Sequence, residues 1–230
     1  MQPIGFSTGA LAKGDFRKAL QIIQDNDIDV VELSCLRLNE LGPLMEALPD
    51  LDLHRFRYVS IHAPGGFSAE EEKTVLQELQ KAVLKQIPVV VHPDSIFDFH
   101  GWEEMGKFVL LENMDRRKPV GRSVPELRPF FDRLPEAGFC LDLGHARQFD
   151  PSMTIAVSLS EDFKDRLRQL HVSEVNSFSR HERLSWLSWF ALRRINGQLF
   201  KGVPIVLESP VEPKDIDAEI SFALDALRLT

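Results

Sequence analysis

Four short apolar runs in this chain each end on an ionisable residue of a type that binds metal ions. The runs FVLLE, GFCLD, LRQLH and PIVLE end on Glu112, Asp142, His171 and Glu208. A buried strand gains no packing energy from a charge at its end, whereas a metal site needs oxygen and nitrogen ligands from distant segments. A divalent cation also removes the repulsion between neighbouring carboxylates. The pattern predicts that these residues bind a divalent metal ion.

Other ionisable residues lie near the ends of further apolar runs. Glu32, His62 and His92 occupy such positions, and His145 follows Asp142 in the segment DLGH. Each has an alternative structural role, because a histidine can bind backbone carbonyls and a glutamate can pair with an arginine or hold a ligand in place. We therefore leave a structural and a functional role open for His62, His92 and Glu32, and the functional role of Glu32 would be substrate binding.

Eight short segments rich in Val, Ile, Leu or Phe must position these side chains. They span residues 3–7, 29–34, 58–63, 88–93, 108–113, 139–144, 169–174 and 204–209. Most are continuously apolar, which is typical of parallel strands covered by helices on both faces. Helical patterns between and after them cover residues 14–26, 68–86, 123–134, 181–195 and 215–229.

The alternation of strand and helix predicts one (β/α)8 TIM barrel spanning residues 1–230. A doubly wound open sheet is the alternative fold. Such a sheet usually has a glycine-rich turn after its first strand, and FSTGALAKG does not match that pattern. In a barrel, the carboxyl ends of all strands meet at one mouth, so the ionisable residues would share a site.

The composition and charge of the chain argue against nucleic acid and membranes as partners. The formal net charge is −8, without the basic runs that nucleic-acid binding favours, so a nucleic-acid partner is not expected. No apolar run is long enough to cross a membrane, and the N-terminus does not look like a signal peptide. The two cysteines, Cys35 and Cys140, are expected to be buried and unpaired. We expect a cytoplasmic protein.

Six short motifs in barrel order resemble the xylose isomerase-like TIM-barrel superfamily. They are SIHAP (60–64), VVHPD (90–94), LLENMD (110–115), LDLGHA (141–146), HVSE (171–174) and VLESP (206–210). The superfamily includes sugar isomerases and epimerases, and the endonuclease IV type of apurinic-site nucleases. The resemblance implies that the four residues named first are its shared ligands of a divalent ion, which would be Mn²⁺, Zn²⁺ or Mg²⁺.

In the nuclease branch, the resemblance implies additional metal ions. His62 and His92 match ligands of a second zinc ion, with Glu112 bridging, and His145 and His181 match ligands of a third. The nuclease pattern has an aspartate two residues before the histidine that matches His181, where this chain has Ser179. Because a hydroxyl is a poor replacement for a carboxylate on zinc, the third site is expected to be weak.

An isomerase or epimerase acting on a small sugar, sugar phosphate or polyol is the function that the sequence favours. Glu112 and Glu208 would exchange protons with the two faces of one substrate carbon, and His145 would hydrogen-bond a substrate oxygen. Arg180 or Arg147 would bind a terminal phosphate. Asn113, which follows Glu112, is expected to orient that glutamate.

Two other functions stay open. One is a zinc-dependent phosphoester hydrolase of the endonuclease IV type, which the number of bound ions would distinguish from a single-ion isomerase. The other is a catalytically degenerate barrel that binds a metal or sugar. Trp186, Trp189 and Phe190 follow helical spacing, and we interpret them as barrel packing or as a subunit contact in a homo-oligomer.

Overall fold

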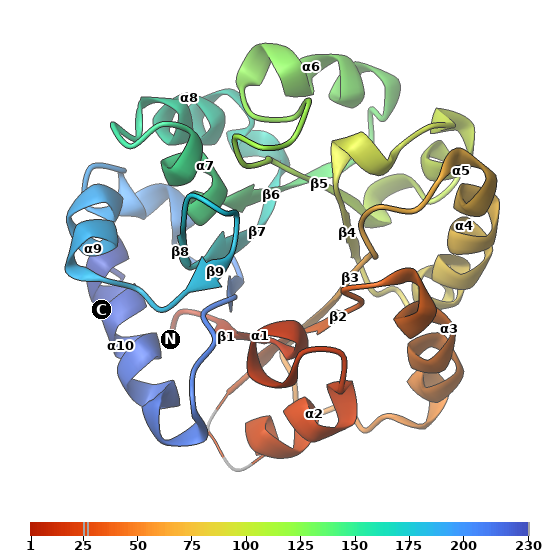
Figure 1. Ribbon diagram of the computed structural model, residues 1–230, viewed down its shortest axis with the longest axis horizontal. Coiled ribbons are helices and arrows are strands. Elements are labelled where there is room, and N and C mark those ends of the chain that lie inside the picture. Colours follow the sequence, from red (N-terminus) through yellow and green to blue (C-terminus); the bar gives the residue numbers. More distant parts are fainter. Residues whose placement is uncertain (25, 27, 230) are drawn as a thin grey trace.

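The computed structural model describes residues 1–24, 26 and 28–229. Within this part of the chain, eight parallel strands close into a barrel that helices surround (Figure 1). The strands follow the order β1-β10-β7-β6-β5-β4-β3-β2 around the barrel. Their bounds are β1 Ile4–Ser7, β2 Val30–Ser34, β3 Tyr58–His62, β4 Val89–Val91, β5 Val109–Glu112, β6 Gly138–Asp142, β7 Leu167–Val172 and β10 Ile205–Leu207. The predicted TIM barrel is confirmed.

Every predicted strand segment overlaps one barrel strand, but the sequence reading missed a small antiparallel ribbon. Its strands β8 (Glu174–Val175) and β9 (His181–Glu182) follow β7, and Val175 pairs with His181. Strands of two residues are too short to show the alternating pattern that identifies a strand. The ribbon matters because it places His181 beside the barrel mouth.

The predicted helix over 181–195 is consequently wrong at its start. The helix in this region, α9, spans Trp186–Leu192, and Ser185 is its N-cap. The Ser185 hydroxyl accepts hydrogen bonds from the backbone N–H groups of Leu187 at 3.2 Å and Ser188 at 3.4 Å. Because this cap begins the helix at Trp186, the residues before it are free to form the ribbon.

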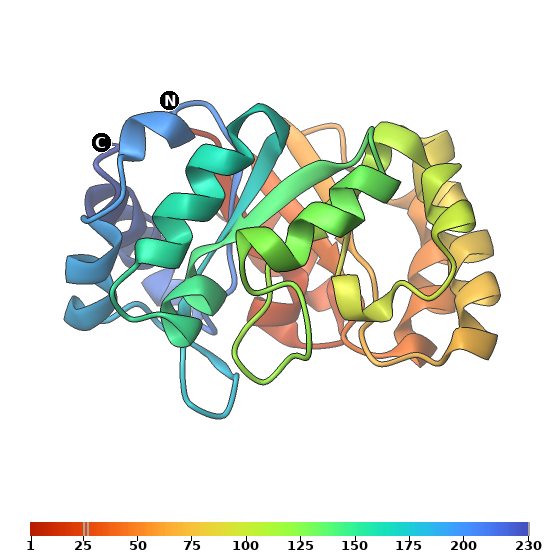
Figure 2. The same ribbon diagram turned by 90° about the horizontal axis from the view of Figure 1, so that it is seen from above.

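Most of the remaining helices surround the barrel, whereas the short helices α1 and α7 directly follow β1 and β6 at its mouth (Figures 1 and 2). Their bounds are α1 Thr8–Ala12, α2 Phe16–Gln24, α3 Leu38–Ala47, α4 Ala69–Leu84, α5 Phe99–Glu103, α6 Val124–Arg133, α7 Leu143–Phe149, α8 Thr154–Asp162 and α10 Ile216–Leu227. The predicted helix over 14–26 corresponds to α2, and its residue 25 lies outside the described residues.

The aromatic side chains of α9 divide between packing and exposure. Trp189 packs against α10, where its indole N–H donates to Asp225 Oδ2 at 2.5 Å. Trp186 and Phe190 are 66% and 64% exposed. The packing role therefore holds for Trp189, while the subunit contact and the homo-oligomer stay predictions.

Two expectations about the chain as a whole can be compared with the fold. Cys35 and Cys140 are buried and free, as predicted. Among the helices of the described residues, none combines the length and the apolar character needed to cross a membrane.

Gly5 provides a test of the barrel packing, because a side chain at this position of β1 would collide with β2. A Cβ atom on Gly5 would lie 1.8 Å from the carbonyl oxygen of Val30. We predict that Gly5→Ala lowers the free energy of unfolding by at least about 2 kcal/mol, because backbone atoms must shift. Urea unfolding followed by circular dichroism measures this change.

The matched control is Gly42→Ala in α3, where an added Cβ would meet no described atom within 4 Å apart from its chain neighbours and its own helix backbone. This variant should change the stability by less than about 1 kcal/mol, because the helix preference of alanine offsets the crowding of its Cβ by the ring of Pro43. Equal stabilities for the two variants would contradict the described packing of β1 against β2.

Candidate metal centre

The carboxyl ends of the barrel strands surround a cavity of 720 Å³. Glu112 and His62 are the last residues of β5 and β3, while His92 and Glu208 directly follow β4 and β10. All four side chains line the cavity. The parallel barrel therefore brings residues from distant segments to one mouth, as the strand-end pattern predicts.

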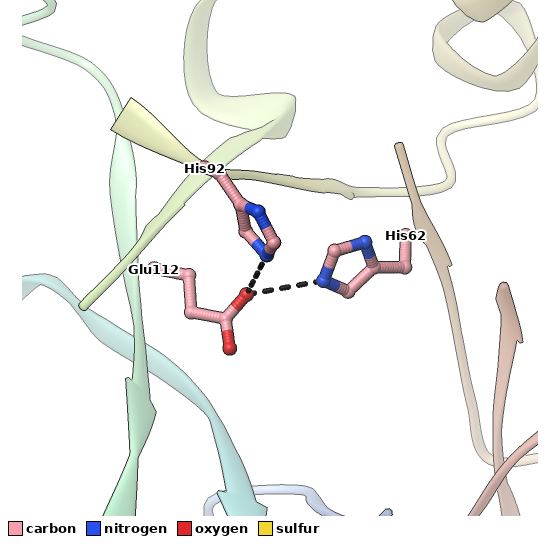
Figure 3. Close-up of side chains that lie close together, drawn as sticks. All are labelled: His62, His92 and Glu112. Atoms are coloured by element: carbon pink, nitrogen blue, oxygen red, sulfur yellow. Dashed lines mark hydrogen bonds and ion pairs between the residues drawn. The ribbon is translucent and has the colours of Figure 1, made fainter. Parts of the chain in front are cut away.

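Glu112 lies at the centre of the cluster, and its two carboxylate oxygens face different imidazoles. Oε2 lies 3.0 Å from His62 Nε2 and 3.1 Å from His92 Nε2 (Figure 3). Oε1 lies 3.0 Å from His171 Nδ1 and 3.4 Å from His145 Nδ1. This carboxylate is only 1% exposed and belongs to two groups of possible ligands, one with His62 and His92 and the other with Asp142, His171 and Glu208.

The His62 ring is oriented so that Nε2 faces Glu112. His62 Nδ1 donates to the Ala63 carbonyl at 2.8 Å, because a carbonyl oxygen can only accept. Burial lowers the pKa of His62, but the hydrogen bond and the charge of Glu112 outweigh burial and raise this pKa to about 9. A proton between His62 and Glu112 thus stabilises an arrangement that a metal ion can also stabilise.

The four residues that the sequence singled out first are brought together. Glu112, Asp142, His171 and Glu208 each offer one ligand atom, and these atoms all lie within 4.8 Å of one another. Within the described part of the chain, Asp142 Oδ2 and Glu208 Oε2 are buried without a hydrogen-bond partner. Such atoms require a compensating partner, and a divalent cation is one that suits carboxylate and imidazole ligands.

Electrostatics at Asp142 supports the same conclusion. Burial, together with the charges of Glu208 and Glu112, raises the pKa of Asp142 well above its usual range. Burial opposes the ionisation of His171, but the charges of nearby carboxylates including Glu32 outweigh it, so the pKa of His171 is raised well above its usual value. Several buried acids in contact need positive charge, and the donor set therefore fits a divalent ion.

A third group of possible ligands consists of Asp142, His145 and His181, whose ligand atoms also lie within 4.8 Å of one another. Ser179 is not part of it, because its hydroxyl donates to Asp115 Oδ1 at 2.8 Å. The carboxylate of this group comes from Asp142, which also belongs to the first four residues. The third site thus differs from the sequence-based expectation in having a carboxylate within reach.

His145 is held in one tautomer. Its Nδ1 donates to the Asn113 carbonyl at 3.0 Å, and burial lowers the pKa of His145 to about 4. The ring is therefore neutral, and Nε2 has a free lone pair. His145 is suited to bind a cation or to accept a hydrogen bond, and not to donate one to a substrate oxygen through Nε2.

Asn113 orients a different acid from the one expected. Its side-chain Nδ2 donates to the Asp142 carbonyl at 2.9 Å, and its Oδ1 accepts from the Asp142 backbone N–H at 2.8 Å. The expectation that Asn113 orients Glu112 is corrected accordingly. The two hydrogen bonds join the ends of β5 and β6, which holds Asp142 in register with Glu112.

Glu32 has the structural role that was left open for it, and not that of a substrate-binding residue. It is fully buried one layer below the mouth, where its Oε2 lies 3.0 Å from His171 Nε2 and accepts from Gln169 Nε2 at 2.7 Å. Glu32 lies two residues before the end of β2, so its side chain points into the barrel interior. A carboxylate on the far nitrogen of His171 leaves Nδ1 facing the cluster.

The two arginines predicted to bind substrate do not line the cavity. Arg147 pairs with Glu174 at 3.3 Å, and Arg180 is exposed outside the cavity lining. The cationic side chains that do line it are Lys13, Arg117 and Lys118. Sequence reasoning missed them, although each lies in a segment soon after a strand end, where the loops of a barrel mouth are expected.

Substitution of Glu112 tests whether it joins two metal positions. We predict that Glu112→Gln lowers the number of tightly bound divalent ions by at least one, because a neutral amide is a poorer bridging ligand. Elemental analysis of protein dialysed against Zn²⁺ or Mn²⁺ measures the stoichiometry. Glu126→Gln in α6, away from the cavity lining, is the matched control and should bind as many ions as the wild type. Unchanged stoichiometry in both variants would exclude the bridging role.

Glu32 can be tested separately from the ligands. Because Glu32 acts on the metal site through His171, Glu32→Gln should weaken metal affinity by roughly 10–100-fold while the barrel stays folded. Competition with a chromophoric chelator measures the affinity, and circular dichroism checks the fold. A metal affinity equal to that of the wild type would show that metal binding by His171 does not depend on the contact of its Nε2 with Glu32.

Comparison with known proteins places the fold. No protein-family model matches the chain, and no curated protein matches it. Endonuclease IV from Thermus thermophilus matches with a TM-score of 0.69 at 19% identity, over 99% of this chain and 100% of that one. A provisionally named sugar phosphate isomerase/epimerase from Anabaena variabilis matches with a TM-score of 0.61 at 14% identity, over 100% and 88% of the chains. A xylose isomerase-like TIM-barrel protein from Mycobacterium smegmatis, solved with magnesium, matches with a TM-score of 0.56 at 12% identity, over 99% and 98%. The chain has the fold of the xylose isomerase-like TIM barrels.

Proposed function

We propose that this protein is a divalent-metal-dependent phosphoester hydrolase. The observation that carries the proposal is the position of Glu112, which has His62 and His92 on one carboxylate oxygen and His171 on the other. This arrangement suits two neighbouring ions that share one carboxylate. Pairs of ions about 3.5–4 Å apart are typical of enzymes that cleave phosphoesters.

The sequence alone favoured a single-ion isomerase, and the ligand geometry is the reason to prefer hydrolysis. An isomerase needs one ion on Glu112, Asp142, His171 and Glu208. It does not use His62 and His92 as ligands, although both direct Nε2 at the same oxygen of Glu112. The similarity of the fold to an endonuclease IV agrees with a phosphoester substrate.

In the proposed hydrolase, the side chains of the cluster would hold two metal positions. When bound, divalent ions supply Lewis acidity toward a phosphoryl oxygen and activate water at neutral pH. His62 and His92 hold one position with Glu112, while Asp142 and His171 hold the next. Glu208 lines the cavity, and its Oε2 lies 3.6 Å from His171 Nδ1, so it would complete the ligand set of this second position.

A metal-dependent sugar phosphate isomerase is the second candidate. It is favoured by the presence of two glutamates, Glu112 and Glu208, among the four residues that could hold one ion. One would remove a proton beside the substrate carbonyl and the other would return it. In this case His62 and His92 would only orient Glu112, so their removal would affect turnover less.

Removal of both outer histidines separates the two candidates. We expect zinc- or manganese-loaded wild type to release nitrophenolate from bis(p-nitrophenyl) phosphate. Outer partners of metal ligands typically contribute about 10–100-fold, so loss of two ligands in His62→Ala/His92→Ala should lower kcat by at least about 100-fold. The absorbance of the released nitrophenolate follows the reaction.

The control for this experiment is His54→Ala/His100→Ala, which removes two exposed histidines outside the cavity lining. It should keep the wild-type rate. Isomerisation of a sugar phosphate by wild type, retained in the His62/His92 double variant and without phosphoester cleavage, would reject hydrolysis and favour the second candidate.

A further inference from the structure

Two loops stand together at the mouth of the barrel. One follows β5 and spans residues 113–123, and the other joins β8 to β9 over residues 176–180; both project from the same face in Figure 2. Two hydrogen bonds join them: Arg117 Nη1 donates to the Phe178 carbonyl at 2.7 Å, and Ser179 Oγ donates to Asp115 Oδ1 at 2.8 Å. The loops therefore form one wall of the cavity.

Arg117 presents charge to the cavity from this wall. Its side chain is exposed, and its guanidinium forms an ion pair with none of the carboxylates in the described chain. Lys118 differs, because its Nζ pairs with Asp94 at 2.8 Å. After its bond to Phe178, the Arg117 guanidinium keeps most of its N–H donors, which match the oxygens of a phosphate.

Phe178 presents an apolar surface beside that charge. Its side chain is 69% exposed and lines the cavity. An exposed phenyl ring and a guanidinium on the same wall suit a ligand that has both a flat ring and an anionic group, because rings stack on either side chain. Neither residue belongs to the groups of possible metal ligands.

The size and charge of the site favour a small ligand. A cavity of 720 Å³ lies within the range of about 300–1,000 Å³ that is usual for small-molecule sites. The formal net charge of −8 opposes the approach of a long polyanion, since phosphate neutralisation needs many cationic contacts. A nucleotide-sized molecule with one phosphate needs only a few.

We propose that Arg117 and Phe178 form the specificity site for a small phosphoester of nucleotide size. Arg117 binds the phosphate, and Phe178 stacks on the ring that the phosphate carries. This inference rests on the proposed phosphoester chemistry and narrows its substrate class. It assigns specificity to the wall formed by the two loops, whereas the strand-end residues carry the metal ions.

Calorimetric binding to the zinc-loaded protein tests the proposal. The probe is the methylene phosphonate analogue of AMP, whose P–C bond resists hydrolysis, with inorganic phosphate for comparison. Arg117→Ala should weaken binding of both probes by at least about 10-fold, because a charge-assisted hydrogen bond is lost. Phe178→Ala should weaken binding of the AMP analogue by about 5-fold or more and leave binding of phosphate unchanged, because only the analogue has a ring to stack.

Neighbouring residues supply matched controls. Arg116→Ala removes an exposed arginine that does not line the cavity, and Phe190→Ala removes a phenyl ring that is 64% exposed on α9. Both variants should bind the AMP analogue as the wild type does. Circular dichroism and zinc content, unchanged in all four variants, would separate lost recognition from lost structure.

Three outcomes would overturn the specificity site. In the first, Arg117→Ala and Arg116→Ala bind the AMP analogue with equal affinity. In the second, Phe178→Ala weakens binding of phosphate as much as binding of the analogue. In the third, a short DNA duplex binds the wild type more tightly than the analogue does. Failure of the proposed hydrolysis gives a different result, in which wild type binds the analogue through Arg117 and Phe178 but cleaves no phosphoester.

Discussion

The burial of several carboxylates at one end of a closed barrel is the constraint on which the rest of this structure depends. Glu112 and Asp142 are 1% and 0% exposed, and Glu208 lies beside them. Like charges at this separation repel, and burial increases the penalty. Imidazoles relieve part of it, as the contacts of Glu112 with His62 and His171 demonstrate. Divalent cations would relieve the rest, which links the stability of the mouth to its chemistry.

Side chains inside the barrel hold the cluster in place through a defined set of hydrogen bonds. Glu32 and Gln169 contact the far nitrogen of His171 from inside the barrel, and Tyr58 donates to Gln169 Oε1 at 2.9 Å. At the mouth, Asn113 joins the backbone of Asp142 to the end of β5. Ligands held from rigid strands in this manner need little rearrangement to bind an ion, which favours tight and selective binding.

The barrel and the inner cluster could be predicted from sequence because their signals are local. A continuous apolar run indicates a buried strand. The parallel topology of the barrel then brings residues such as Glu112 and Glu208 to one mouth. Glu32 stayed open between a structural and a substrate-binding role, and Asn113 was assigned to the wrong acid, because both roles depend on side-chain direction and on backbone contacts between strands. His181 was placed in a helix, since a ribbon with two-residue strands has no periodic signal. Arg117 and Phe178 lie in loops, whose path depends on tertiary contacts.

The carboxylates of Glu112 and Asp142 each belong to two groups of possible ligands, so the number of ions at the mouth is the central question. Glu112 joins the histidine pair to the inner four residues, and Asp142 joins those four to His145 and His181. The most direct measurement is an anomalous difference map at the zinc absorption edge from crystals grown with zinc. The account predicts at least two peaks, one on each side of the Glu112 carboxylate and about 3.5–4 Å apart. A single peak within the inner four residues, with His62 and His92 still bonded to Glu112, would contradict it.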